Sequence, residues 1–142
     1  MPAPDSVEAK PKYFTAAEAN KALPLVRAIV GDIVAQFRTV NEHKQRLLSL
    51  KNQRRRPGAP PDAYAEETAQ SQVDLEAEEA QLIAYIEELT RLGVELKGPD
   101  GLCDFPSIRD GREVYLCWRL GEPDVRFWHE INAGFAGRQP LE

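Results

Sequence analysis

Apolar residues recur three or four positions apart over two long stretches of the chain. In the first stretch they form one stripe, interrupted by Lys44: Val26, Val30, Ile33, Phe37, Val40 and Leu47. In the second stretch a leucine recurs every seven residues, with Ile86 on the same stripe: Leu75, Leu82 and Leu89. This spacing places the apolar side chains on one face of an α-helix. The pattern therefore predicts two long helices that pack as an antiparallel hairpin.

The start of the first helix carries a recognisable signal. Thr15 and Glu18 have the spacing of a capping box, in which each side chain accepts a hydrogen bond from the backbone N–H of the other residue. Pro24 follows about two turns later and lacks the N–H that a helix uses. We expect it to kink the helix or to begin a second one.

Helix-breaking residues indicate where the hairpin turns and where it stops. Residues 56–61 combine proline and glycine, so the first helix is expected to end near Lys51. Asp62 can cap the second helix. Gly93 can adopt the left-handed conformation that ends it.

The last third of the chain changes to the alternation of apolar and polar residues that is typical of β-strands. Residues 102–108 and 113–120 flank Asp110-Gly111, the dipeptide preferred in two-residue β-hairpin turns. A turn at this dipeptide places residue 104 opposite 117 and residue 103 opposite 118. Residues 125–131 follow another turn and are expected to form a third strand.

This register divides the side chains between two faces of the predicted sheet. The face expected to cover the core contains Cys103, Phe105, Val114, Leu116, Trp118 and Leu120. Asp104 and Cys117 belong to the opposite face, so the two cysteines should not form a disulfide. In the third strand, we assign His129 to the core face, together with the apolar residues that are separated from it by an even number of positions.

These elements predict an α+β fold: a long antiparallel helical hairpin, a small three-stranded antiparallel sheet against one end of it, and a docked C-terminal loop. Residues 13–142 then form a single domain, with the hairpin in 13–93 and the sheet and loop in 94–142. Residues 1–12 contain three prolines and few apolar groups, so we expect a disordered tail.

Composition narrows the class of protein. The chain has 142 residues and a net charge of −5, so its field repels nucleic acid and anionic lipid. No apolar run approaches the roughly 20 residues of a membrane span, and the N-terminus lacks a signal-peptide pattern. Two cysteines are too few for a disulfide scaffold. We expect a cytoplasmic protein that binds neither membrane nor nucleic acid.

Four residues of the predicted sheet are candidate ligands for a divalent metal such as zinc: Asp104, Cys117, His129 and Glu130. Zinc prefers three or four cysteine, histidine or carboxylate ligands in tetrahedral geometry. The simple register argues against convergence, because it directs Asp104 and Cys117 outward and His129 inward. A β-bulge at Pro106 would be needed to bring these side chains together.

A second group of residues could bind a small anionic ligand: Tyr115, Arg119, Trp128 and Arg138. The arginines could hold a carboxylate or phosphate bidentately while an aromatic ring stacks on an attached group. In the alternative interpretation, the arginines bond to Glu122 and Glu130 and fix the turns.

The sequence contains little that indicates catalysis. Cys117 could act as a nucleophile only if a base such as His129 lowered its pKa. Asp104, Glu122 and Glu130 could supply an acid–base pair, but carboxylates are common on any acidic domain. We therefore name no catalytic residue.

The two helices also predict self-association. Each helix normally buries an apolar arc of at least about 100°. Two helices and one small sheet would leave part of those arcs uncovered, and a homodimer that forms a four-helix bundle would cover them. The most direct interpretation of the sequence is therefore a non-catalytic interaction or scaffold protein. The alternative is a metal- or small-anion-binding protein with its site on the C-terminal sheet.

Short motifs near both ends of the chain resemble those of a known family. They are Tyr13-Phe14-Thr15, Glu18-Ala19-Asn20, Leu23-Pro24, Gly101-Leu102, Asp104-Phe105-Pro106, Asp110-Gly111-Arg112, Leu116-Cys117-Trp118, Gly121-Glu122, Trp128-His129-Glu130 and Gly134-Phe135-Ala136-Gly137-Arg138. With these the chain resembles the uncharacterised bacterial proteins grouped as DUF2203. The resemblance implies a small bacterial cytosolic protein without an established activity. It also places any ligand site in the sheet and C-terminal loop.

Overall fold

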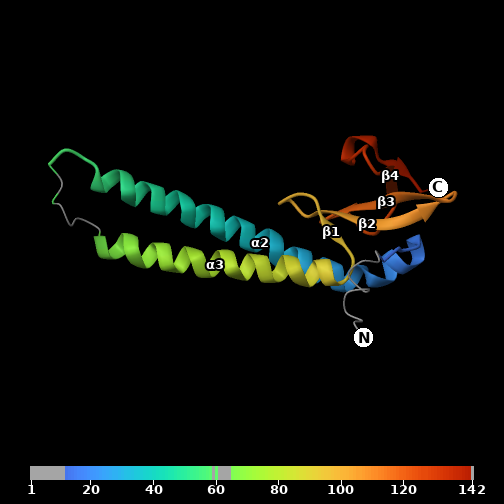
Figure 1. Cartoon of the computed structure of the whole chain (residues 1–142), viewed down its shortest axis with the longest axis horizontal. Coiled ribbons are helices and arrows are strands. Elements are labelled where there is room, and N and C mark those ends of the chain that lie inside the picture. The colour runs from blue at the N-terminus through green and yellow to red at the C-terminus, as the bar shows by residue number, and fades with distance from the viewer. Residues whose placement is uncertain (1–11, 59, 61–64, 142) are drawn as a thin grey trace, which may run out of the picture.

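The structure is a computed structural model that describes residues 12–58, 60 and 65–141 (Figure 1). The predicted tail, apart from residue 12, and the predicted cap at Asp62 lie outside the described residues. The fold is α+β, as expected, with two long helices and one antiparallel sheet.

Helix α2 spans Ala16–Arg54 and helix α3 spans Ala65–Arg91. The capping box is confirmed, because the Glu18 N–H donates to the Thr15 hydroxyl at 3.0 Å and the Thr15 N–H donates to the Glu18 carboxylate at 2.9 Å. Pro24 lies inside α2 and does not begin a second helix. Figure 1 shows the first turns of α2, in dark blue, inclined to the rest of the helix.

The helices pack as the predicted antiparallel hairpin, which extends well beyond the sheet (Figure 1). The α3 leucines of the seven-residue repeat are buried, and so is most of the predicted α2 stripe. Gly93 has a φ of 92° and ends the hairpin as expected. Within the described residues, neither helix is apolar enough along its length to cross a membrane.

The sheet has five strands rather than the three expected, and each strand pairs with its neighbour in sequence. They are β1 (Glu95–Leu96), β2 (Leu102–Arg109), β3 (Arg112–Arg119), β4 (Phe127–Glu130) and β5 (Gln139–Pro140). The additional strands β1 and β5 contain two residues each. A strand of this length is too short to show an alternating pattern in the sequence. The predicted C-terminal loop thus contains β5 and the short 3-10 helix η1 (Phe135–Gly137).

The register between β2 and β3 is the one predicted from the turn. Asp104 lies opposite Cys117, Cys103 lies opposite Trp118, and the pairing continues past Pro106 without a bulge. The turn residues Asp110 and Gly111 have φ angles of 52° and 78°, as a type I′ turn requires.

One face of the sheet packs on the N-terminal part of α2 and the segment before it. Its predicted core residues Cys103, Phe105, Val114, Leu116 and Trp118 are buried. Phe14 stacks edge-on against Phe105 with ring centroids 5.2 Å apart, and Phe14 N–H donates to the Pro106 carbonyl at 2.8 Å. Both cysteines are free, as expected from their opposite faces.

The predicted orientation of β4 is wrong. Leu116 pairs with Trp128 and Tyr115 pairs with His129, so Trp128 faces the core and His129 lies on the outer face. The alternation of residues 125–131 permits either set of side chains to face the core. Burying the larger Trp128 side chain is more favourable than burying Phe127, so Trp128 takes the core face. This reversal places His129 on the same face as Asp104 and Cys117.

Candidate metal site

Three potential metal ligands converge on the outer face of the sheet. Asp104 of β2, Cys117 of β3 and His129 of β4 each offer a ligand atom, and these atoms lie within 4.8 Å of one another. The residues are only 3%, 0% and 2% exposed. Asp104 and Cys117 are direct cross-strand partners, whereas His129 is the diagonal neighbour of Cys117 on the next strand.

The two ring nitrogens of His129 have different partners. Nδ1 lies 2.7 Å from the backbone carbonyl oxygen of Glu130, and Nε2 lies 2.9 Å from Asp104 Oδ1. A carbonyl oxygen only accepts hydrogen bonds, so Nδ1 carries a proton. Nε2 is therefore the nitrogen that can bind a metal, in the orientation that metal-ligating histidines commonly take from a backbone carbonyl.

The second carboxylate oxygen of Asp104 pairs with Lys97. The Lys97 ammonium lies 3.2 Å from Asp104 Oδ2, 3.5 Å from Glu95 and 4.3 Å above the Tyr115 ring. Burial alone would lower the pKa of Lys97, but the hydrogen bond and charge of Asp104 raise it overall. Lys97 thus stays protonated and leaves Oδ1 facing His129.

The Cys117 thiol lies in an environment that disfavours its ionised form. Burial, followed by the negative charge of Asp104, raises its pKa from 9.0 to about 11, although Arg138 acts in the opposite direction. Cysteine nucleophiles have lowered pKa values, so this environment is unlike that of a catalytic thiol. A metal ion would displace the thiol proton when it binds.

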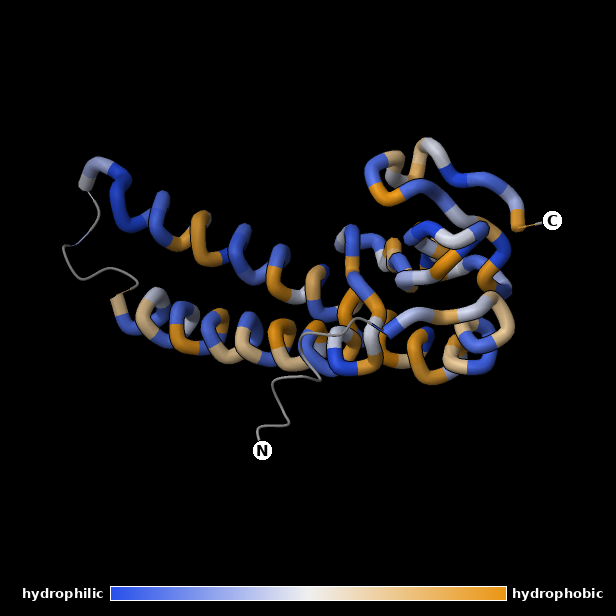
Figure 2. Tube along the Cα trace, turned by 45° about the vertical axis from the view of Figure 1, so that its right-hand side comes forward, coloured by the Kyte–Doolittle hydropathy of each residue, from blue (hydrophilic) through white to orange (hydrophobic). Residues whose placement is uncertain are grey.

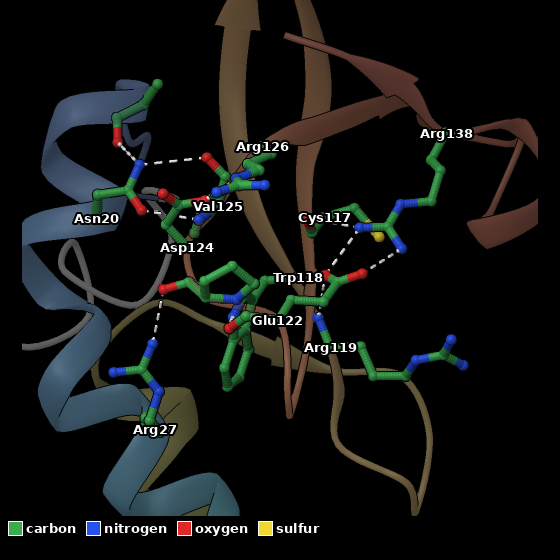
Figure 3. Close-up of polar contacts among 12 residues, drawn as sticks. Asn20, Arg27, Cys117, Trp118, Arg119, Glu122, Asp124, Val125, Arg126 and Arg138 are labelled. Atoms are coloured by element: carbon green, nitrogen blue, oxygen red, sulfur yellow. Dashed lines mark hydrogen bonds and ion pairs between the residues drawn. The ribbon is translucent and has the colours of Figure 1, made fainter.

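Arg138, from the C-terminal segment, lies beside Cys117 (Figure 3). Its Nη1 and Nη2 donate to the two oxygens of Glu122 at 2.8 and 2.9 Å, and Nη2 lies 3.4 Å from the Cys117 carbonyl oxygen. The guanidinium also stacks on Phe127 and Phe135, 3.9 and 4.5 Å from the ring centroids. Burial disfavours the ionised form of Glu122, but the hydrogen bonds from Arg138 and Arg119 outweigh it and lower its pKa.

The remaining predicted site residues do not join the cluster. The Glu130 carboxylate pairs with Arg112, and Glu130 contributes only its carbonyl oxygen to His129. Trp128 lies on the core face. Tyr115 donates to Glu95, and Arg119 donates to Asp100. The arrangement of the arginines is therefore closer to the alternative in which carboxylates fix them.

Sequence reasoning missed Glu95 and Lys97. Glu95 belongs to the two-residue strand β1 and Lys97 follows directly after it, so neither lies in a stretch long enough to show a pattern. It also missed a polar cluster in the helical hairpin. His43 Nδ1 lies 2.7 Å from Glu78 Oε1, and Nε2 lies 2.8 Å from Ser71 Oγ. This order of acid, imidazole and hydroxyl resembles that of serine hydrolases. Ser71 lies inside α3, however, and the backbone N–H groups there donate to helix carbonyls. An oxyanion hole needs N–H groups that can donate to the substrate instead.

The fold and the cluster define an α+β protein in which a helical hairpin supports a five-stranded antiparallel sheet, with aspartate, cysteine and histidine buried on its outer face. The family described as "Uncharacterized conserved protein (DUF2203)" matches residues 12–141, and the chain belongs to this family. No curated protein and no solved structure matches the chain significantly. The family description assigns no activity, so function has to be inferred from the site.

Proposed function

We propose that this protein binds a divalent transition metal through Asp104, Cys117 and His129, and that zinc is the ion that suits this donor set best. The observation that carries the proposal is the convergence of an oxygen, a sulfur and a nitrogen donor from three adjacent strands. Zinc accepts such mixed sets, whereas magnesium and calcium prefer oxygen ligands alone.

The separations between the donors are compatible with one ion. Zinc bonds of about 2.0–2.3 Å place tetrahedral ligands about 3.3–3.7 Å apart. The donor atoms lie within 4.8 Å of one another, with Nε2 and Oδ1 at 2.9 Å. Small side-chain rotations suffice to reach the tetrahedral separations.

A buried His129–Asp104 pair could also exist without an ion, because a proton between Nε2 and Oδ1 satisfies both groups. The thiol favours the metal interpretation, since Cys117 contributes a third donor at the same point. The backbone bond to Nδ1 favours it further, because it leaves Nε2 for the ion.

Metal analysis with two matched cysteine variants tests the proposal. Protein purified without chelator or affinity metal is loaded with zinc and measured by native mass spectrometry. We expect one ion per chain in the wild type and in Cys103→Ala, and loss of the ion in Cys117→Ala and His129→Gln. Cys103 is the control because it is equally buried on the other face. Equal zinc content in the two cysteine variants, or no ion in the wild type, overturns the proposal. Circular dichroism checks that each variant is folded.

We propose as a second candidate that the protein forms a cytoplasmic homodimer through the hairpin and acts as a scaffold. The supporting observation is that the outer turns of both helices extend beyond the sheet, where, within the described part of the chain, they pack on each other alone (Figures 1 and 2). Two large apolar side chains of the hairpin are exposed, Leu48 of α2 by 52% and Ile83 of α3 by 56%. Sedimentation across a concentration series should show a dimer that Leu48→Glu and Ile83→Glu weaken. A monomer at all concentrations contradicts this candidate.

A further inference from the structure

One face of α2 is covered by the sheet in the first half of the helix and is uncovered further along. Gly101, in the loop before β2, approaches this face so closely that a Cβ atom on it would lie 3.1 Å from Val30 Cγ1 and 3.2 Å from Val34 Cγ2. Leu48 follows Val30 by 18 positions, which is five turns of 3.6 residues, so both side chains point the same way. Val30 is 0% exposed, whereas Leu48 is 52% exposed. The sheet ends before Leu48, so the outer part of this face is open within the described residues (Figure 1).

Helix α3 contributes an exposed apolar side chain to the same side of the hairpin. Lys44 of α2 and Glu79 of α3 form an ion pair at 3.5 Å on this side. Leu48 lies four positions after Lys44, and Ile83 lies four positions after Glu79, so each is a neighbour of the ion pair on its own helix. Ile83 is 56% exposed. We call this surface the outer flank, formed by Lys44, Leu48 and Lys51 of α2 and by Glu79, Ile83 and Glu87 of α3.

The two helices give the outer flank opposite charges. Leu48 lies between two lysines at neighbouring positions of its helix, whereas Ile83 lies between two glutamates. Residues 43–54 at the end of α2 contain no acidic residue, whereas α3 contains eight and a single base. Within the described part of the chain, Lys51 and Glu87 form no ion pair. The flank therefore offers one basic and one acidic stripe, each with an apolar side chain at its centre.

We propose that the outer flank binds a second copy of this chain, and that Leu48 of one copy contacts Ile83 of the other. This inference rests on the homodimer proposed above and adds the surface and the pairing of the helices. Two-fold symmetry makes the contact occur twice, because a residue of one subunit that contacts its partner receives the same contact in return. The pairing places the basic stripe of α2 on the acidic stripe of the partner's α3. Contact between like helices would instead oppose equal charges, which disfavours association.

Charge reversal in the full chain tests this pairing, with the dimer measured by sedimentation across a concentration series at low ionic strength. We expect Lys51→Glu and Glu87→Lys each to weaken the dimer about tenfold, because each places like charges together at both symmetric contacts. The double variant should regain the affinity of the wild type, since the two charges have only exchanged places. Contact between like helices predicts that neither single variant weakens the dimer, because equal charges face each other before and after the change.

Arg46→Glu is the matched control for Lys51→Glu. Arg46 is also an exposed base of α2, but it lies only two positions from Leu48 and so points to a different side of the helix. The change in net charge is the same, and we expect this variant to dimerise as the wild type does. Circular dichroism checks that each variant is folded.

The outcomes separate the pairing from the dimer itself. A dimer that neither single variant weakens, or that the double variant does not restore, overturns the pairing and leaves the homodimer in place. Equal weakening by Arg46→Glu also overturns the pairing, because the effect would then come from net charge alone. A wild type that remains monomeric at all concentrations overturns both proposals and leaves the outer flank to a different partner.

Discussion

The two bidentate arginine–glutamate pairs of the sheet provide a direct test of how burial determines the value of a charge pair. Arg138–Glu122 and Arg112–Glu130 share the same chemistry. The side chains of the first pair are 12% and 25% exposed, whereas those of the second are 51% and 40% exposed. We therefore expect Arg138→Met to destabilise the protein strongly and Arg112→Met hardly at all.

The magnitude follows from what Arg138→Met leaves behind. Methionine preserves much of the stem that packs between the aromatic rings, so the loss comes mainly from Glu122. Breaking a fully buried pair costs about 3–5 kcal/mol. Glu122 keeps some solvent contact and the hydrogen bond from Arg119 N–H at 2.9 Å. We expect about 2–3 kcal/mol, equivalent to roughly 6–12 °C in Tm for a chain of this size.

Urea unfolding of the wild type, both methionine variants and Glu122→Gln measures these losses. The double variant of Arg138 and Glu122 should show a coupling energy of about 1–3 kcal/mol, because the residues form one network. Arg112→Met should stay within experimental error of the wild type, since solvent screens exposed pairs. Equal losses in the two methionine variants would refute the reasoning from burial.

Three further outcomes follow from buried polar groups. Because the pKa of Glu122 is lowered in the folded protein, its ionised carboxylate stabilises the fold at neutral pH, and this contribution is lost as pH falls below about 4.5. The difference in urea midpoint between wild type and Glu122→Gln should therefore shrink between pH 5 and 3. Burial raises the pKa of Cys103 to about 12 and that of Cys117 to about 11, so both thiols should resist iodoacetamide at pH 8 in the native protein and react in urea. Mass spectrometry of the labelled protein measures this, and rapid labelling of either native thiol would contradict the described burial. His43→Ala should lower stability by about 2–3 kcal/mol in thermal unfolding, because it leaves the Glu78 carboxylate and a partly buried hydroxyl without their partner; an unchanged Tm would show that water replaces the imidazole freely.

The accuracy of the sequence predictions depended on how locally each feature is encoded. The capping box, Gly93 and the Asp110-Gly111 turn involve residues a few positions apart, and all three were confirmed. The first helix ends three residues later than predicted because the final turn continues until the breaker residues begin. Strand pairing across a two-residue turn is likewise local, so the register of β2 and β3 could be derived correctly.

The candidate site depended on the orientation of β4, which no tight turn determines. Asp104, Cys117 and His129 were all among the candidates, and the structure brings them together, whereas the assumed inward orientation of His129 had kept them apart. The bulge at Pro106 that was thought necessary is absent, because β2 and β3 pair continuously past this residue. Glu130 was included on residue type alone, and its carboxylate bonds to Arg112 instead. Periodicity cannot distinguish the two faces when each carries a large aromatic side chain.

The order of the strands has a consequence for how the protein folds. Every strand of the sheet pairs with its neighbour in the chain, so no crossover connection is needed to bring the three donors together. Short loops close quickly and at low entropic cost, and folds rich in such contacts form fast. The β2–β3–β4 meander can therefore assemble the whole donor set within a segment of 29 residues, from Leu102 to Glu130, before the helical hairpin docks.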